Sequence, residues 1–136
     1  MELAQRGFAL WTVAMTDPDE AAWREALREM VELFHPEAEL DFTRTTPDIA
    51  GGREALASWI EGARDTYTSL DMKATEFIDV RDAVLMTVQF TGHGAASGLT
   101  VTGELAYVFR YRNGQTIAAT TFATRREALQ AVGMEE

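Results

Sequence analysis

Residues 99–122 hold two runs of alternating apolar and polar residues, joined by a turn sequence. In the first run, one set of alternate positions is large and aromatic and includes Leu105, Tyr107 and Phe109. This alternation predicts a β-strand whose aromatic face packs on the main core. Asn113-Gly114 follows, and Asn-Gly between two such runs is the strongest short-range signal for a β-hairpin. We therefore predict a long hairpin at the centre of a sheet.

The opposite face of the first hairpin strand is apolar at its centre, at Ala106 and Val108. A strand that is apolar on both faces is covered on both. The chain's own helices could cover one face, and a second subunit could cover the other. We therefore expect a homodimer through the outer face of the sheet, with Ala106 and Val108 at its interface.

Apolar residues with helical spacing predict three helices in the first half of the chain. They recur at i, i+3 and i+4 in residues 3–16, in a second segment that ends near residue 34, and in residues 53–65. Asp17 is expected to cap the second helix, and Pro18 to occupy its first position.

Further strands are predicted at residues 37–44, 70–80 and 83–91, and a short final helix begins at Thr124 and stops at Gly133. This order of elements indicates an α+β fold in which a curved, mostly antiparallel sheet wraps around the three N-terminal helices. Such a sheet leaves an internal cavity, and clefts of this kind hold small molecules. No linker or repeat interrupts the chain, so we expect a single domain, residues 1–136.

Composition argues against several classes of function. The formal net charge is -10 and no basic cluster is longer than Arg125-Arg126, which argues against nucleic acid and anionic membranes as partners. The absence of cysteine excludes disulfides, thiolate metal sites and a cysteine nucleophile. Neither a signal peptide nor an apolar run of membrane-spanning length is present, so we expect a cytoplasmic protein.

Five short motifs follow one another along the chain: LFHPEAE at 33–39, GREAL at 52–56, EFID at 76–79, AYVFRYRNG at 106–114 and REALQAVG at 126–133. Together they resemble the SnoaL-like branch of the nuclear transport factor 2-like (NTF2-like) superfamily over nearly the whole chain. The resemblance implies a conical α+β fold that is commonly dimeric through the outer sheet face. Members include polyketide cyclases, ketosteroid isomerases, scytalone dehydratase and limonene epoxide hydrolase, so it also implies small-molecule chemistry.

The positions that match the catalytic residues of ketosteroid isomerase hold other residue types in this chain. Matched by strand, its aspartate base falls on Phe42, with Asp41 one position away. Its tyrosine falls near Gly7 and its protonated aspartate falls on Tyr107, so isomerisation of 3-oxosteroids is not expected. The last strand, residues 116–124, has no acidic residue and no histidine, which also weakens a polyketide cyclase function.

Three side chains are candidates for acid–base chemistry: Tyr107, Glu76 and Asp41. Tyr107 has inward parity, and a buried phenol can donate a hydrogen bond to a carbonyl or enolate oxygen; the alternative is a core tyrosine with a backbone partner. Glu76 shares its parity with Leu70, and a carboxylate on an apolar face could serve as a general base. A bulge that turns Phe77 inward and Glu76 outward is the alternative. Strand alternation points Asp41 outward unless a bulge brings it into the cavity.

Large apolar side chains are expected to make the cavity walls hydrophobic, with one arginine that could meet an acidic ligand group. The predicted pocket-lining residues are Trp11, Phe42, Arg44, Trp59, Met86, Phe90, Phe109 and Phe122. The ligand is therefore expected to be a small apolar molecule. His35 and His93 lie far apart without a spaced carboxylate motif, so no metal site is expected. Gly51-Gly52 lacks the Lys-Ser/Thr that would follow in a phosphate-binding loop, and no cofactor is expected either.

Two functions remain open on these observations. The first is a cofactor-independent enzyme of cyclase, isomerase or hydrolase type, which does acid–base chemistry on an apolar oxygenated metabolite. The second is a non-catalytic ligand-binding or accessory protein, which the missing catalytic groups favour.

Overall fold

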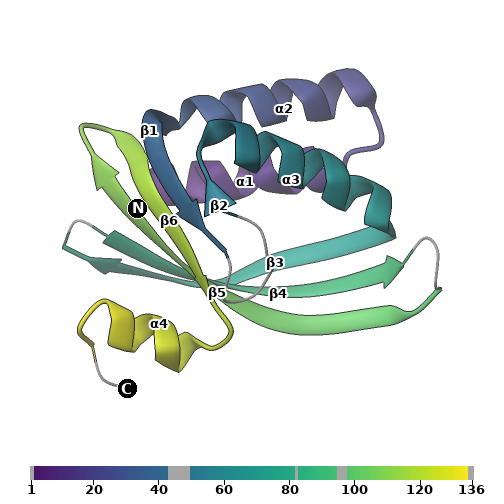
Figure 1. Cartoon of the computed structure of the whole chain (residues 1–136). Helices are drawn as coiled ribbons and strands as arrows, with labels where there is room; N and C mark the ends of the chain where they lie inside the picture. The colour runs from purple at the N-terminus through teal and green to yellow at the C-terminus, as the bar shows by residue number, and fades with distance from the viewer. Residues whose placement is uncertain (1, 43–49, 82, 95–97, 135–136) are drawn as a thin grey trace.

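Three helices lie on one face of a six-stranded sheet, and a fourth helix lies on the opposite face (Figure 1). The computed structural model describes residues 2–42, 50–81, 83–94 and 98–134. The three helices on the inner face are α1 (Glu2–Thr16), α2 (Glu20–Glu32) and α3 (Arg53–Thr66), and the fourth is α4 (Arg125–Ala131). This arrangement confirms the predicted α+β fold.

The sheet has the strand order β2-β1-β6-β5-β4-β3. Its strands are β1 (Phe34–Asp41), β2 (Ala50–Gly51), β3 (Tyr67–Val80), β4 (Ala83–Gly94), β5 (Thr100–Arg112) and β6 (Gln115–Phe122). Only the β1–β6 pairing is parallel among the described strands, so the sheet is mostly antiparallel as expected. No described helix is long and apolar enough to cross a membrane.

The predicted hairpin is formed by β5 and β6. Asn113 and Gly114 have φ angles of 53° and 81°, and positive φ at both central residues is what a two-residue type I′ turn requires. The alternation in β5 is also confirmed, because Leu105, Tyr107 and Phe109 pack on the inner core.

The start of α2 differs from the prediction. Asp19, rather than Asp17, is the N-cap, and its side chain accepts a hydrogen bond from Ala21 N at 3.1 Å. Asp17 Oδ1 instead accepts from Asp19 N at 2.9 Å and makes the turn that leads into the helix. Asp17 and Asp19 are both suitable N-cap residues, and the sequence alone does not show which of them caps the helix.

Strand β1 also begins earlier than predicted, at Phe34 rather than residue 37. It reaches Phe34 because this residue pairs with Thr116 of β6, a partner remote in sequence. The register shifts between Phe34 and Glu39, and this irregularity accommodates Pro36, which has no backbone N–H to donate to the sheet.

Helix α4 covers the outer face of the sheet. Thr124 Oγ1 accepts from Glu127 N at 3.1 Å, as the capping prediction required, and Leu129 packs into a second core on β4 and β5. Ala106 and Val108 lie in this core at 0% and 4% exposure. Their assignment to a dimer interface is therefore wrong, because a helix of the same chain covers them.

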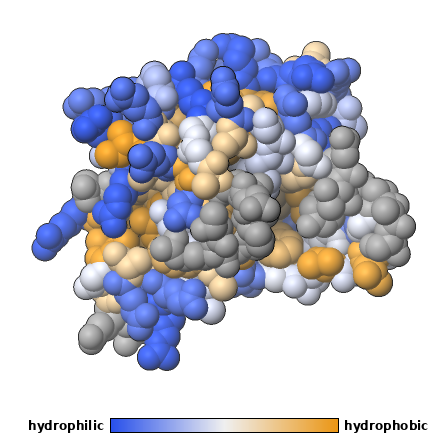
Figure 2. Space-filling model, in the orientation of Figure 1, coloured by the Kyte–Doolittle hydropathy of each residue, from blue (hydrophilic) through white to orange (hydrophobic). Residues whose placement is uncertain are grey.

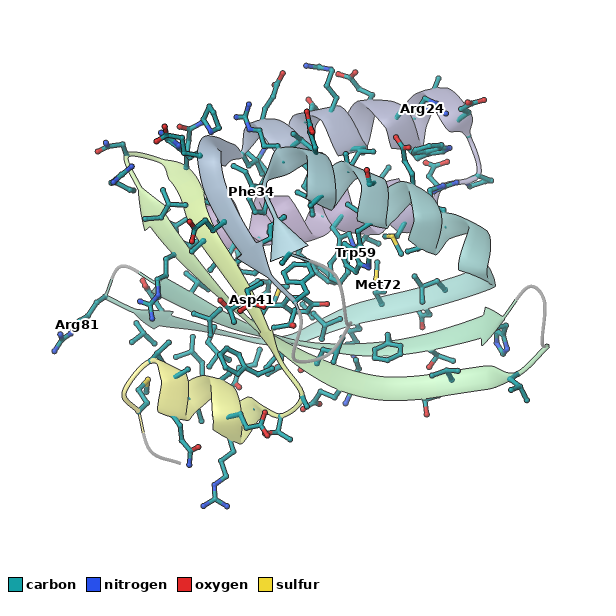
Figure 3. The ribbon with its side chains drawn as sticks, viewed as in Figure 1. Arg24, Phe34, Asp41, Trp59, Met72 and Arg81 are labelled. Carbon is teal, nitrogen blue, oxygen red and sulfur yellow. The ribbon has the colours of Figure 1, made fainter. Side chains whose placement is uncertain are left out.

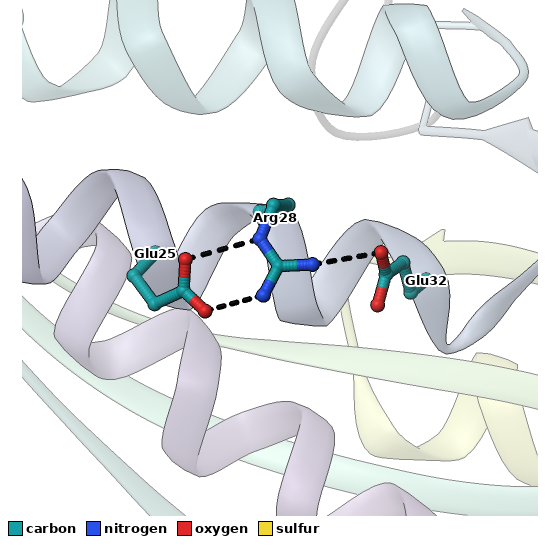
Figure 4. Close-up of polar contacts among 3 residues, drawn as sticks. All are labelled: Glu25, Arg28 and Glu32. Carbon is teal, nitrogen blue, oxygen red and sulfur yellow. Dashed lines mark hydrogen bonds and ion pairs between the residues drawn. The ribbon is translucent and has the colours of Figure 1, made fainter.

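The outer surfaces of α2 and α4 are hydrophilic (Figure 2). On α2, Arg28 lies between Glu25 and Glu32 and forms ion pairs with both; its Nη1 lies 2.9 Å from Glu32 Oε1 (Figure 4). Such exposed i,i+3 and i,i+4 pairs contribute little to stability, because solvent screens the charges and the long side chains lose freedom. The inner faces of the helices supply the core and the site.

Candidate functional site

An apolar cavity of about 50 Å³ lies between the three N-terminal helices and the inner face of the sheet. Trp59 points from α3 into this space (Figure 3). The described residues that line the cavity are Leu3, Ala4, Gly7, Phe8, Trp11, Met30, Leu33, Phe34, Phe42, Leu56, Trp59, Met86, Tyr107, Phe109, Tyr111 and Thr116.

Four aromatic rings, which we call the aromatic quartet, form a closed set of contacts at one part of the wall. Trp11 contacts Trp59 and Tyr107, with ring centroids 6.0 and 5.5 Å apart. Phe42 contacts the same two rings at 5.2 and 6.0 Å, both edge to face. These are the separations at which aromatic pairs attract each other. The quartet joins α1, α3, β5 and the residue that follows β1 into one wall.

Trp11 carries a buried polar atom without a partner. Its Nε1 has no hydrogen bond to any described residue. An indole N–H can only donate, and a buried donor left unpaired costs about 1–3 kcal/mol. A hydrogen-bond acceptor placed beside this atom would remove that cost.

Tyr107 is a second donor beside Trp11. Its side chain is only 4% exposed, and within the described part of the chain its hydroxyl makes no hydrogen bond. Burial raises the pKa of Tyr107, so the phenol keeps its proton and its ability to donate.

The other polar groups of the cavity are also neutral hydroxyls. Tyr111 has a pKa raised by burial, and Thr116, at 4% exposure, donates its backbone N–H to Leu33 O at 2.9 Å. None of the described lining residues carries a carboxylate, an imidazole or a cation. The site can therefore donate hydrogen bonds, but these residues provide no strong base.

Five of the predicted pocket residues line this cavity: Trp11, Phe42, Trp59, Met86 and Phe109. Phe122 does not; it pairs with Ala106 across the β5–β6 ladder and lies in the outer core with α4. Phe90 is not a lining residue, and its ring lies against Gly103. Arg44 lies outside the described residues.

Glu76 does not reach the cavity, which corrects the first prediction for this residue. A register shift between Ala74 and Glu76 turns Phe77 inward and Glu76 outward. There Glu76 Oε1 accepts from Arg125 Nε of α4 at 2.6 Å. This bulge, which the sequence allowed as an alternative, determines the face of the sheet on which Glu76 lies.

Asp41 is not among the lining residues either. Its neighbours Leu40 and Phe42 are 3% and 4% exposed and pack in the inner core, so the strand alternation holds and points Asp41 the other way. His35 Nδ1 accepts from Glu37 N, and His93 Nδ1 lies 2.9 Å from Thr100 Oγ1. No group of three or more possible metal ligands occurs among the described residues.

Several lining residues were not predicted. Leu3, Gly7 and Tyr111 could have been found, because they share the helical face of Trp11 or the strand parity of Tyr107. Thr116 carried no such signal, since only the parallel pairing of β6 with β1 brings it to the cavity.

The fold is shared with several solved structures. An NTF2-like protein of unknown function from Exiguobacterium sp. 255-15 superposes with a TM-score of 0.73 at 14% identity, covering 90% of this chain and 98% of that one. A candidate SnoaL-like polyketide cyclase from Jannaschia sp. CCS1 gives 0.70 at 19% identity, with 99% and 92% covered. A protein with a ketosteroid isomerase-like fold from Catenulispora acidiphila DSM 44928, in complex with trimethylamine, gives 0.67 at 15% identity, with 94% and 92% covered.

These likenesses show the fold, and curated proteins provide no match to the chain. The model of the SnoaL-like domain family matches residues 6–119, which is most of the sequence. The helices on the inner face, the mixed sheet and the cavity between them agree with that match. The chain therefore belongs to the SnoaL-like domain family, and its fold is the one seen in the NTF2-like structures.

Proposed function

We propose that this protein binds a neutral, mainly apolar small molecule, and that Trp11 Nε1–H and the Tyr107 hydroxyl donate hydrogen bonds to an oxygen atom of that ligand. The unpaired indole N–H beside an apolar cavity carries the proposal. A ligand oxygen would remove the penalty of this unpaired donor, and the surrounding rings would bury the rest of the molecule.

The electrostatics of the wall favour a neutral ligand. A charged group that enters an apolar cavity without a partner loses its hydration and gains little in return. The described lining residues offer no opposite charge, and the net charge of -10 repels anions. A ketone, enone or ether oxygen fits these conditions better than a carboxylate or a phosphate.

Binding is better supported than proton transfer. Tyr107 and Trp11 could polarise a carbonyl group, which favours an enzyme as the second candidate. Proton transfer, however, also needs a base, and Glu76 and Asp41 are not among the lining residues. A ligand-binding protein needs only the donors and the apolar wall.

The size of the cavity bounds the ligand. An engineered apolar cavity of about 150 Å³ binds benzene. The cavity here, about 50 Å³, is a third of that size, so a six-membered ring requires the wall to widen. The first probes are therefore small ketones, up to a single six-membered ring.

A matched pair of probes tests the hydrogen bond. Cyclohexanone and methylenecyclohexane have nearly the same shape, but only the ketone has an acceptor. In the wild type, we expect cyclohexanone to shift the Trp11 indole proton downfield in NMR titrations, and the alkene to leave it in place. In Trp11→Phe, the ratio of ketone to alkene affinity should fall about 5–10-fold, the worth of one hydrogen bond of 1–1.5 kcal/mol.

Trp23→Phe is the control, because Trp23 is not a lining residue and stacks between Arg24 and Arg64 at 4.5 and 4.3 Å. It should leave the affinity ratio unchanged. An unchanged ratio in Trp11→Phe would refute the proposal. Binding of trimethylammonium chloride without binding of the ketone would show instead that the aromatic quartet holds a cation.

A further inference from the structure

Gly7 occupies a position in α1 where glycine has no local advantage. It lies within the helix, and glycine is less favourable than alanine in a helix interior. Its φ is not among the positive values that favour glycine. The backbone conformation therefore does not explain the residue.

Close packing does not explain Gly7 either. A Cβ atom placed there meets one heavy atom within 4 Å, Leu33 Cδ1, at the ordinary contact distance of 3.8 Å. Gly103 is a useful contrast, because a Cβ there would lie 3.0 Å from the ring of Phe90. A side chain at Gly103 would require the ring of Phe90 to shift, whereas Gly7 leaves room that its neighbours do not fill.

The room at Gly7 belongs to the cavity and adjoins the unpaired donor. Gly7 lines the cavity, and Trp11 follows it by four residues on the same helical face. Helical side chains lean toward the N-terminus, so the indole of Trp11 is directed toward the preceding turn, which contains Gly7, without filling the space within 4 Å of a Cβ placed there. The contact between Trp11 and Phe8, with centroids 5.9 Å apart, agrees with this direction. A ligand held by Trp11 Nε1 therefore has the bare backbone at Gly7 beside it.

We propose that Gly7 determines the size of ligand that the cavity accepts. The apolar ring of a monocyclic ketone lies against the α1 backbone at Gly7, while its oxygen accepts from Trp11. This inference rests on the proposed function and adds to it a ligand class, single-ring ketones, and the residue that sets the upper limit of their size.

Gly7→Ala tests the inference through two readouts that should move in opposite directions. The melting temperature should rise by about 2–5 °C, because alanine is the better helix residue and its methyl group meets no clash. The affinity for cyclohexanone should fall about tenfold or more, because the methyl group overpacks the ligand site. The affinity for acetone, which needs less room, should change by less than about twofold.

Gly62→Ala is the matched control. Gly62 lies in α3, and a Cβ atom there meets nothing within 4 Å. This variant should raise the melting temperature to a similar extent and leave both affinities unchanged. It separates the helix effect of alanine from the loss of space at the cavity.

The possible failures are distinguishable. A lower melting temperature for Gly7→Ala would show that α1 needs glycine for packing, and unchanged cyclohexanone affinity would show that the ligand does not lie there; either overturns the inference. Because the methyl group of Gly7→Ala takes up space, it should lower the affinity for cyclohexanone and for methylenecyclohexane to a similar extent. Trp11→Phe should instead change the ratio of the two affinities. If Gly7→Ala loses affinity for both probes while Trp11→Phe leaves the ratio of ketone to alkene affinity unchanged, the size limit is supported and the hydrogen bond is refuted.

Discussion

Arg64 offers the sharpest test of how the cavity walls are held together. It extends from α3, which carries Trp59, to the end of α1, which carries Trp11. Its Nη1 donates to Ala14 O at 2.6 Å and its Nη2 to Asp17 O at 2.8 Å. A cation at the C-terminus of a helix also meets the negative end of the helix dipole. Arg64 therefore ties the C-terminal end of α1 to α3, the two helices that carry Trp11 and Trp59.

The expected loss in Arg64→Ala follows from these contacts. Two charge-assisted hydrogen bonds contribute about 1.5 kcal/mol each at the low end of their range, which suits a half-buried group. Stacking over the ring of Trp23, at 4.3 Å, adds about 0.5–1 kcal/mol. We expect Arg64→Ala to lower the free energy of unfolding by about 3–4 kcal/mol. Arg64→Lys should lose about half as much, since lysine keeps the charge but lacks the planar fork.

Urea denaturation followed by circular dichroism measures this loss as a shift of the midpoint at constant slope. Arg24→Ala is the control, because Arg24 also stacks on Trp23, at 4.5 Å, but its hydrogen bond goes to the exposed Glu20. It should cost less than about 0.5–1 kcal/mol. An effect of Arg64→Ala no larger than that of Arg24→Ala would refute the role of the two carbonyl contacts.

Three further predictions concern the outer face and the buried phenols. Glu76→Gln should lower stability by about 1 kcal/mol or less and leave cyclohexanone affinity unchanged, because its carboxylate binds α4; a large affinity loss would contradict its placement. Burial raises the pKa of Tyr107 and Tyr111 above the ordinary value of 10, so the folded state keeps protons that the unfolded state loses, and stability should fall as pH rises above about 10. Tyr107→Phe should weaken that fall in urea titrations. We still expect a homodimer, so light scattering at micromolar concentration should give twice the chain mass. Glu104→Arg, on the exposed part of the outer sheet face, should reduce the measured mass. A monomeric wild type would contradict the expectation.

The sequence by itself determined the elements and most of the faces of this protein, because these depend on local periodicity and turn chemistry. Asn113-Gly114 requires positive φ at both positions and predicted the hairpin, and alternation along β5 placed Tyr107 on the inner face. The family followed from motifs at turns and caps, which report architecture more than chemistry.

Tertiary structure decided which side chains meet at the site. One extra residue near Ala74 reversed the face of Glu76, and periodicity could not predict that bulge because its local pattern fits either side. Coverage of Ala106 and Val108 depended on where α4 docks, which is a contact between segments distant in sequence. The unpaired N–H of Trp11 and the open space at Gly7 are likewise properties of packing: they exist only because of what the neighbouring elements leave unfilled.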